Sequence, residues 1–131
     1  MTGLDTNVLV RFLTQDDPDQ SARANELLET RCSREHPGRI AVVVLCEMVW
    51  VLRGAYRYDK ALVVSVLEQL LDTVELQIEC EDVVHEALAA YRKGRADFAD
   101  YVIACGNRHA GCEVTYSFDQ KLAEHANVRQ P

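Results

Sequence analysis

The chain alternates short apolar, β-branched segments with longer amphipathic ones, and this alternation limits its possible folds more than any other feature. Segment 60–72 places Leu and Val side chains on one face at the spacing of a helix. Segment 40–45 is apolar throughout, as in a strand buried on both faces of a sheet. By these criteria the expected strands are 2–5, 40–45, 74–78, 113–116 and 127–130, and the expected helices are 6–13, 16–32, 47–54, 60–72, 81–93 and 96–110, with a helical turn at 119–125. Short strands that alternate with helices form βαβ units, so we predict an α/β fold: a short, mostly parallel central sheet of four to five strands with helices on both faces.

Length and composition are those of one globular domain. The chain has 131 residues, of which 48% are hydrophobic, enough to bury a single core. We therefore expect one domain over residues 1–131. The longest apolar run, 40–46, is too short to cross a bilayer, and the chain does not begin with a basic segment followed by an apolar one. These features predict a cytoplasmic protein that does not associate with membranes.

The charge balance excludes one class of nucleic-acid protein. With 14 Lys and Arg against 21 Asp and Glu, the formal net charge is −7. A protein that coats DNA through bulk positive charge would carry the opposite sign. A nucleic-acid enzyme remains possible, because acids gathered at a metal site add to the negative count.

Five acidic residues follow predicted strands or begin the helices beside them. Asp5 ends the first strand, and Glu47 begins the helix that follows the second. Asp97 and Asp100 lie three residues apart in the first turn of the last long helix, and Asp119 follows the fourth strand within three residues. Ligands of open parallel sheets bind beyond the carboxyl ends of the strands. We therefore expect the five carboxylates to gather at one edge of the sheet.

Each acid also has a purely structural explanation. Asp5 and Asp119 could cap the helical segments that follow them, and Asp97 and Asp100 could complement a helix dipole. Glu47 is harder to explain as a surface residue, because its neighbours in sequence are apolar. The combination favours a metal site, since carboxylates gathered in one place repel each other unless a cation lies among them. Oxygen ligands without His or Cys favour Mg²⁺ or Mn²⁺ over zinc.

Four short motifs surround these acids. They are Leu4-Asp5-Thr6-Asn7-Val8-Leu9, Glu47 after an apolar segment, Ala96-Asp97-Phe98-Ala99-Asp100-Tyr101-Val102-Ile103-Ala104, and Ser117-Phe118-Asp119. Each is a weak signal alone. In this order, and from about residue 2 to about residue 129, they resemble the PIN-domain ribonucleases, and more narrowly the VapC-like toxins of bacterial and archaeal toxin–antitoxin pairs.

The resemblance implies a metal-dependent endoribonuclease that uses Mg²⁺ or Mn²⁺, cleaves RNA and is held in check by a VapB-like antitoxin. The catalytic, metal-binding acids it implies are Asp5, Glu47, Asp100 and Asp119, with Asp97 as an additional metal ligand. Asn7 and Ser117 match polar residues that orient the first and last acids; many family members carry Thr where Ser117 stands. The many apolar positions of segment 60–71, a region through which similar toxins pair, also predict a homodimer.

Basic residues near the predicted acidic edge could hold the phosphates of RNA. Arg53 and Arg57 flank the turn after the helix of Glu47, and Arg95 closely precedes Asp97. Their other explanation is that they complement the carboxyl ends of helices. The tyrosines that could either stack on unpaired bases or pack at the edge of the core are Tyr56, Tyr58 and Tyr116.

Three other functions compete with this prediction. A phosphatase of the haloacid-dehalogenase kind also begins with Asp after a short strand, but it needs a second acid two residues later, where Asn7 stands. A receiver domain needs a phosphate-accepting Asp after a central strand and a Lys after a later one, and Glu47 and Asp119 do not match that pattern. A catalytically silent PIN-like scaffold that only binds a partner would differ from the enzyme in a metal titration.

Overall fold

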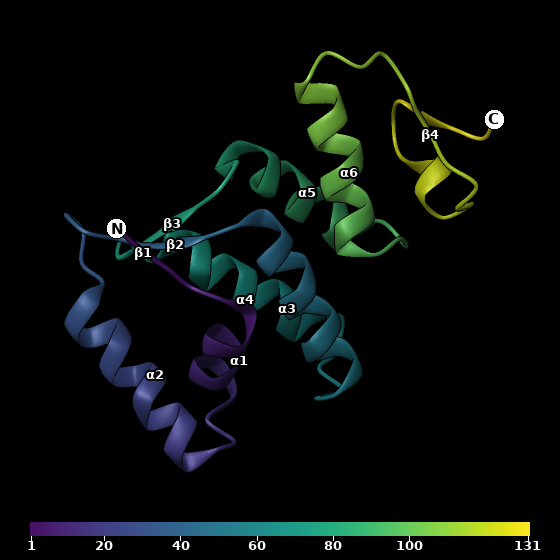
Figure 1. Ribbon diagram of the computed structural model, residues 1–131. Coiled ribbons are helices and arrows are strands. Elements are labelled where there is room, and N and C mark those ends of the chain that lie inside the picture. The colour runs from purple at the N-terminus through teal and green to yellow at the C-terminus, as the bar shows by residue number, and fades with distance from the viewer. The chain divides into compact units, whose positions relative to one another are not determined.

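The computed structural model describes residues 1–131 and contains six α-helices, one 3₁₀ helix and five short strands (Figure 1). The chain groups into two compact units, Met1–Glu79 and Cys80–Pro131. Helices alternate with parallel strands, so the predicted α/β class is confirmed. None of the helices combines the length and the apolar character needed to cross a membrane.

The first unit is built on a three-stranded parallel sheet. The strands in spatial order are β1 (Thr2–Gly3), β2 (Gly38–Ile40) and β3 (Leu76–Ile78). Two helices connect each pair of neighbouring strands, as parallel pairing requires. They are α1 (Thr6–Thr14) and α2 (Pro18–Arg31) between β1 and β2, and α3 (Val42–Gly54) and α4 (Lys60–Asp72) between β2 and β3.

The sheet is tightly packed at Gly38, in its central strand. A Cβ atom at this position would lie 2.8 Å from Leu4 Cδ1 and 2.9 Å from Cys32 Sγ. Both neighbours are buried, so they have little room to give way. Glycine at residue 38 therefore lets the chain around Leu4, one residue before Asp5, lie against the sheet.

Aspartates begin three of the helices in the first unit. Asp17 accepts a hydrogen bond from the backbone N–H of Gln20 (3.0 Å), and Asp59 accepts one from that of Leu62 (2.8 Å). These are ordinary N-caps, which satisfy backbone donors that the first helical turn leaves unpaired. Asp5 is also the N-cap residue of its helix, but its side chain forms no capping hydrogen bond.

The prediction of a strand at 40–45 is wrong for most of that segment. β2 ends at Ile40, and α3 begins at Val42 and runs through the apolar stretch. Val44, Leu45, Met48, Val49 and Leu52 are buried at helical spacing, and this packing outweighs the weak strand preference of β-branched residues. The Glu79 carboxylate, which follows β3, accepts a hydrogen bond from the Val42 backbone N–H (2.9 Å). A side chain distant in sequence thus satisfies a donor at the start of α3, which no local signal predicted.

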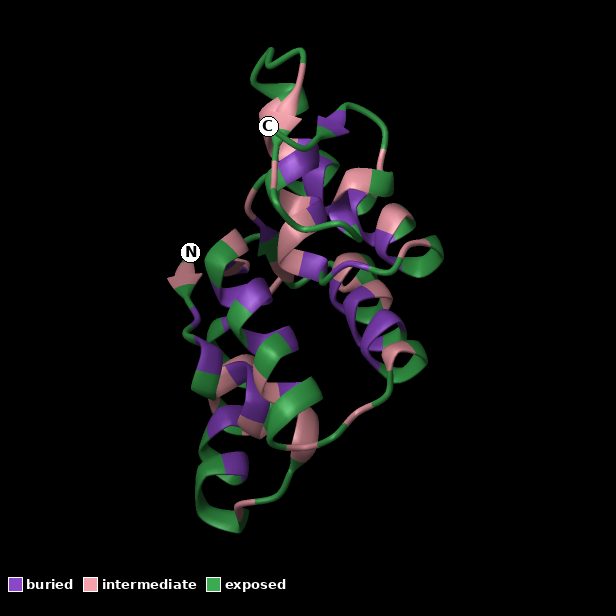
Figure 2. Ribbon diagram, turned by 90° about the vertical axis from the view of Figure 1, so that its right-hand side faces the viewer, coloured by how far each residue is buried: buried purple, intermediate pink, exposed green.

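The second unit packs two helices and a small strand pair. Its elements are α5 (Glu81–Lys93), α6 (Phe98–His109), β4 (Thr115–Tyr116), the 3₁₀ helix η1 (Leu122–Glu124) and β5 (Val128–Arg129). Tyr91 of α5 and Phe98 of α6 meet edge to face, with ring centroids 5.9 Å apart, and both are buried. Buried and exposed residues alternate along the helices, as expected for helices with one apolar face (Figure 2).

The five strands belong to two separate ladders. β4 pairs only with β5, in parallel, while the other three strands form the sheet of the first unit. The structure therefore divides the expected single sheet of four to five strands into one three-stranded and one two-stranded sheet. All of the strands are two or three residues long, so few backbone hydrogen bonds define each ladder.

Candidate active site

In the first unit, Asp5 lies between β1 and α1 with its carboxylate exposed. It takes the extended backbone conformation of an N-cap residue (φ −89°, ψ 165°), yet the carboxylate does not cap the helix. The structural explanation for Asp5 therefore applies to its backbone and not to its side chain. Its carboxylate oxygens remain available to a ligand.

Thr6 connects the start of α1 to Glu47 of α3. The buried Thr6 hydroxyl donates a hydrogen bond to Glu47 Oε1 (3.0 Å), across 41 residues of sequence. This bond holds the Glu47 carboxylate beside the residue that follows Asp5. Thr6 was not predicted to contribute to the site, because no sequence rule pairs two residues so far apart.

The surroundings of Glu47 differ from those expected. It lies within α3 and not at the start of a helix, and its side chain is exposed. Val43 and Trp50, one turn before and one turn after it, are 60% and 57% exposed. The expectation that apolar neighbours would leave Glu47 no solvated face was therefore wrong, because those that are buried lie on the other side of the helix.

Asn7 does not hold Asp5 in this structure. Its side chain is exposed and lines a groove between α1 and α2 together with Arg11 and Arg23. No hydrogen bond joins Asn7 to Asp5. The orienting contact observed in this region is the one from Thr6 to Glu47.

In the second unit, Asp97 and Asp100 occupy the start of α6. Asp97 is the N-cap residue, one position before the helix, and Asp100 is the third residue of the first turn. The prediction that both acids lie inside the first turn is thus correct for Asp100 alone. The Asp97 backbone N–H donates to Asp100 Oδ2 (3.2 Å), which fixes the Asp100 carboxylate over the helix start.

Burial raises the pKa of Asp100, and the negative charges of Asp119 and Asp97 raise it further, against the opposing effect of the hydrogen bond from the Asp97 backbone. Asp97 and Asp119 therefore both lie within electrostatic reach of Asp100. An unpaired, half-buried carboxylate beside two others is unfavourable in the ionised form. A cation at this place would relieve the repulsion.

The loop after β4 holds Asp119 through three hydrogen bonds. Ser117 Oγ accepts one from the Asp119 backbone N–H (3.0 Å). Asp119 Oδ1 accepts one from the backbone N–H of Lys121 (2.9 Å) and one from that of Leu122 (3.2 Å). One oxygen of Asp119 therefore caps the following turn, while Ser117 fixes its backbone as an orienting residue would.

Neither unit contains three or more His, Cys, Asp or Glu side chains already close enough to hold a metal ion. The donor chemistry nevertheless fits a hard divalent cation, because the acids of both units offer carboxylate oxygens only. Asp100 is the best candidate ligand for such a cation. Burial raises its pKa, so its ionised form is unfavourable in the absence of a cation.

The basic residues predicted to bind RNA are partly engaged. Arg95 forms an ion pair with Glu124, and Arg53 donates to the Tyr58 backbone carbonyl (3.3 Å). Arg57 is exposed and has a positive φ of 56°. Of the three, Arg95 would have to leave its partner before it could meet a phosphate.

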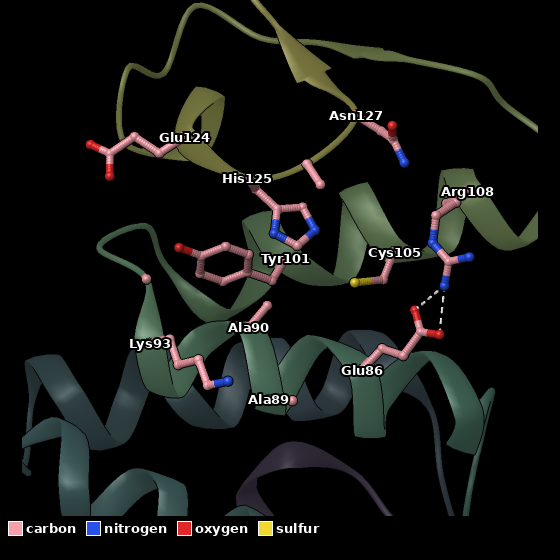
Figure 3. Close-up of a pocket in the computed structure, with 12 residues that line it drawn as sticks. Glu86, Ala89, Ala90, Lys93, Tyr101, Cys105, Arg108, Glu124, His125 and Asn127 are labelled. Atoms are coloured by element: carbon pink, nitrogen blue, oxygen red, sulfur yellow. Dashed lines mark hydrogen bonds and ion pairs between the residues drawn. The ribbon is translucent and has the colours of Figure 1, made fainter.

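A pocket of about 620 Å³ in the second unit was not predicted. Tyr101 and Cys105 of α6, Glu86 of α5 and His125 after η1 contribute to its walls (Figure 3). Arg108 closes one end through its ion pair with Glu86. None of the five predicted acids lines this pocket, so it does not belong to the candidate metal site.

Comparison with known proteins places the chain in a family. The sequence matches the PIN domain family over residues 4–128, and the chain belongs to that family. It is also similar to a VapC ribonuclease of Aquifex aeolicus (strain VF5), with 22% identity over 119 residues, which cover 91% of this chain and 87% of that protein. The chain is therefore a VapC-like PIN-domain protein, as its motifs predicted.

Proposed function

We propose that this protein is a Mg²⁺-dependent endoribonuclease and the toxin of a toxin–antitoxin pair. The observation that carries the proposal is the grouping of Asp97, Asp100 and Asp119 in one small unit, where the first and last both act electrostatically on Asp100. These acids also cap the local backbone, but the charge repulsion on Asp100 is unfavourable without a cation, so the grouping suits a protein that binds a divalent cation. Membership of the PIN domain family and similarity to a VapC ribonuclease support the same function.

The proposed catalytic acids are Asp5, Glu47, Asp100 and Asp119, with Asp97 as an additional ligand. Mg²⁺, or Mn²⁺ in its place, would activate a water molecule and neutralise the charge that develops on the scissile phosphate. Thr6 would position Glu47 through its hydroxyl, and Ser117 would position the Asp119 loop. Because these acids come from both units, we further propose that residues 1–131 act as one PIN domain.

The proposed partners are an RNA substrate and a VapB-like antitoxin, in the cytoplasm. Similarity to a protein named VapC ribonuclease supports the RNA substrate, and the resemblance to the VapC-like toxins implies the antitoxin. The five cysteines, none of them in a C-x-x-C pair, are compatible with a reducing compartment.

We also propose a homodimer, although α4 is not the surface that supports it. Most apolar side chains of α4 are buried within the chain, and Leu62, at 46%, is its only large apolar side chain that is exposed. The exposed Val43 and Trp50 on α3 offer the better apolar surface for a second copy. Light scattering at micromolar concentration should give the dimer mass, and a clean monomer mass would contradict the proposal.

The nuclease is tested by incubating purified protein with RNA while Mg²⁺ is titrated. RNA cleavage should require the metal, stop with a chelator and return when metal is restored. Asp5→Asn and Asp100→Asn should each abolish cleavage, because each removes a charged ligand. Asp82→Asn is the matched control, since Asp82 is an exposed acid in the first turn of α5 without a proposed role.

The outcomes separate the alternatives. Cleavage by Asp5→Asn at the wild-type rate would show that Asp5 is not a catalytic acid. A protein that binds Mg²⁺ or a partner but cleaves no RNA would be the catalytically silent scaffold. Hydrolysis of small phosphate esters without RNA cleavage would instead favour the phosphatase.

A further inference from the structure

Two aromatic side chains next to Asp119 are exposed to solvent. Phe118 is 84% exposed and Tyr116 is 62% exposed. Neither ring contacts another aromatic ring, whereas Tyr56 and Tyr58 contact each other, as do Tyr91 and Phe98. An apolar ring held almost fully in water contributes nothing to the core and is commonly a contact surface.

These rings lie on an ordered part of the chain. The Ser117 backbone N–H, between them, donates to the Arg129 carbonyl (2.9 Å) and extends the ladder of β4 and β5. Ser117 and Asp119 are then tied by the hydrogen bonds of the Asp119 loop. The backbone that carries the rings therefore does not need to be ordered when a ligand binds, which lowers the entropic cost of binding.

Cations accompany the exposed rings. Arg129 of β5 is the register partner of Tyr116, so the two residues are neighbours across the strand pair. Both are exposed, and Arg129 forms no ion pair. Lys121 is likewise exposed and unpaired, whereas Arg95 and Arg108 of the same unit are paired with acids.

We propose that Tyr116, Phe118 and Arg129 form a platform on which unpaired bases of RNA stack beside Asp119. We call these three residues the stacking platform. The inference rests on the proposed nuclease function, which supplies RNA as the substrate. Aromatic faces accept any unpaired base, and neighbouring cations meet its phosphates; this is how proteins hold single-stranded nucleic acid.

The chemistry of the surface favours RNA over a protein partner. The protein is acidic overall, with a net charge of −7, but Lys121 and Arg129 of this unit are paired with no acid and so remain available to the phosphates of RNA. A partner helix would need an apolar groove to bury its anchors. Tyr116, Phe118 and Arg129 line neither the pocket of the second unit nor the two grooves that α1 lines in the first unit.

The position also suits a role in substrate placement. Phe118 directly precedes Asp119, and the hydrogen bonds of the loop fix the backbone between them. A base stacked on Phe118 would therefore hold its attached phosphate close to a proposed catalytic acid. Tyr116 and Phe118 act in this scheme as positioning residues, and they take no part in the chemistry.

The test compares RNA binding by wild-type protein and by Phe118→Leu. Fluorescence anisotropy is measured with a chelator present, so that the labelled RNA stays intact. The RNAs are a short unstructured strand, the same strand with abasic sites, and its duplex. Leucine keeps an apolar side chain but removes the aromatic face, whereas Phe118→Tyr keeps the face.

Phe118→Leu should bind the unstructured strand about 5- to 150-fold more weakly, the loss expected for one stacked base. Phe118→Tyr and the matched control Phe12→Leu, on a different unit, should bind like wild type. The abasic strand should bind wild type and Phe118→Leu equally. Arg129→Gln should reduce the salt dependence of binding by about 0.7 in the slope of log Kd against log salt.

Other results would overturn the stacking platform. Equal affinity of wild type and Phe118→Leu for the unstructured strand would do so. So would an equal loss on all three RNAs, or a change in oligomeric mass without a change in RNA affinity, which would assign the rings to a second copy of the chain.

The cleavage assay keeps this inference separate from the nuclease itself. If the protein cleaves RNA only with metal but Phe118→Leu binds RNA as tightly as wild type, the stacking platform is refuted and the nuclease stands. If Phe118→Leu binds RNA more weakly but the protein shows no metal-dependent cleavage, the nuclease is refuted and the stacking platform stands. If both hold, Phe118→Leu should raise KM and leave kcat near the wild-type value.

Discussion

Replacing Gly94 by alanine should disturb the segment that carries two of the proposed metal ligands. Gly94 has an extended backbone (φ −90°, ψ −179°), which alanine can adopt without strain. A Cβ atom there would nevertheless overlap the Tyr101 hydroxyl and lie 2.6 Å from Tyr101 Cζ. Contact between such atoms begins near about 3.5 Å, so the ring would have to move by about 1 Å.

Tyr101 cannot make that movement freely. It is 2% exposed, and its hydroxyl oxygen accepts a buried hydrogen bond from the Ala96 backbone N–H (3.1 Å). Overpacking a core typically costs about 1–3 kcal/mol, and leaving a buried donor unpaired costs about 1–3 kcal/mol more. We therefore expect Gly94→Ala to lower the free energy of unfolding by about 2–6 kcal/mol.

Urea unfolding followed by circular dichroism measures this loss, and a second variant tests its cause. Tyr101→Phe alone should lose about 1–3 kcal/mol, because the Ala96 N–H then has no acceptor. In the double variant the clash with the hydroxyl is gone, so the combined loss should be smaller than the sum of the two by about 1 kcal/mol or more. RNA cleavage should fall with Gly94→Ala, since Tyr101 adjoins Asp100.

The control is Gly54→Ala, at the end of α3, where an added Cβ would meet nothing within 4 Å. That variant should change stability by less than about 1 kcal/mol. If Gly94→Ala were as stable as wild type, or if the losses of Gly94→Ala and Tyr101→Phe were simply additive, the packing argument would be wrong.

Three further predictions concern the acids. Because burial raises the pKa of Asp100, the folded metal-free protein holds that proton to higher pH than the unfolded chain, so stability falls as the pH rises through the raised pKa. Asp100→Asn should therefore be more stable than wild type at neutral pH and not at acidic pH, by urea unfolding in chelator; the opposite order would contradict this. Asp97→Asn should impair RNA cleavage less than Asp100→Asn in the same assay, and a reversed ranking would make Asp97 the main ligand. Asp59→Ala should lose about 1 kcal/mol as an N-cap, whereas Asp5→Ala should lose much less because its carboxylate caps nothing; equal losses would show that Asp5 is structural.

Helices were predictable where local signals agree. The bounds 60–72 and 81–93 were predicted correctly, because Asp59 caps the first helix, Gly94 follows the second, and each has one apolar face. The segment 40–45 failed because an apolar run of six residues fits either a buried strand or a buried helix. Only the packing of α3 and the distant bond from Glu79 decide between them.

The sequence predicts which residues form the candidate site, but it does not predict which side chains they contact. The motifs point to the acids and to the PIN domain family, and the comparison confirms the family. The bond between Thr6 and Glu47, and the pocket behind Tyr101, depend on which helices meet and could not be predicted from spacing along the chain. The exposure of Phe118 was equally invisible in the sequence, where Ser117-Phe118-Asp119 is only a weak motif.

Three aspartates at helix starts show most clearly what a structure adds. Asp5, Asp17 and Asp59 stand at the same local position, each just before a helix, and nothing in the local pattern separates them. A carboxylate oxygen of Asp17 and one of Asp59 each accept a backbone hydrogen bond, whereas the carboxylate of Asp5 accepts no capping hydrogen bond. A carboxylate that leaves its nearest backbone donors unused is free to bind a ligand, and among these three only Asp5 lies in one of the motifs that predicted the PIN domain family.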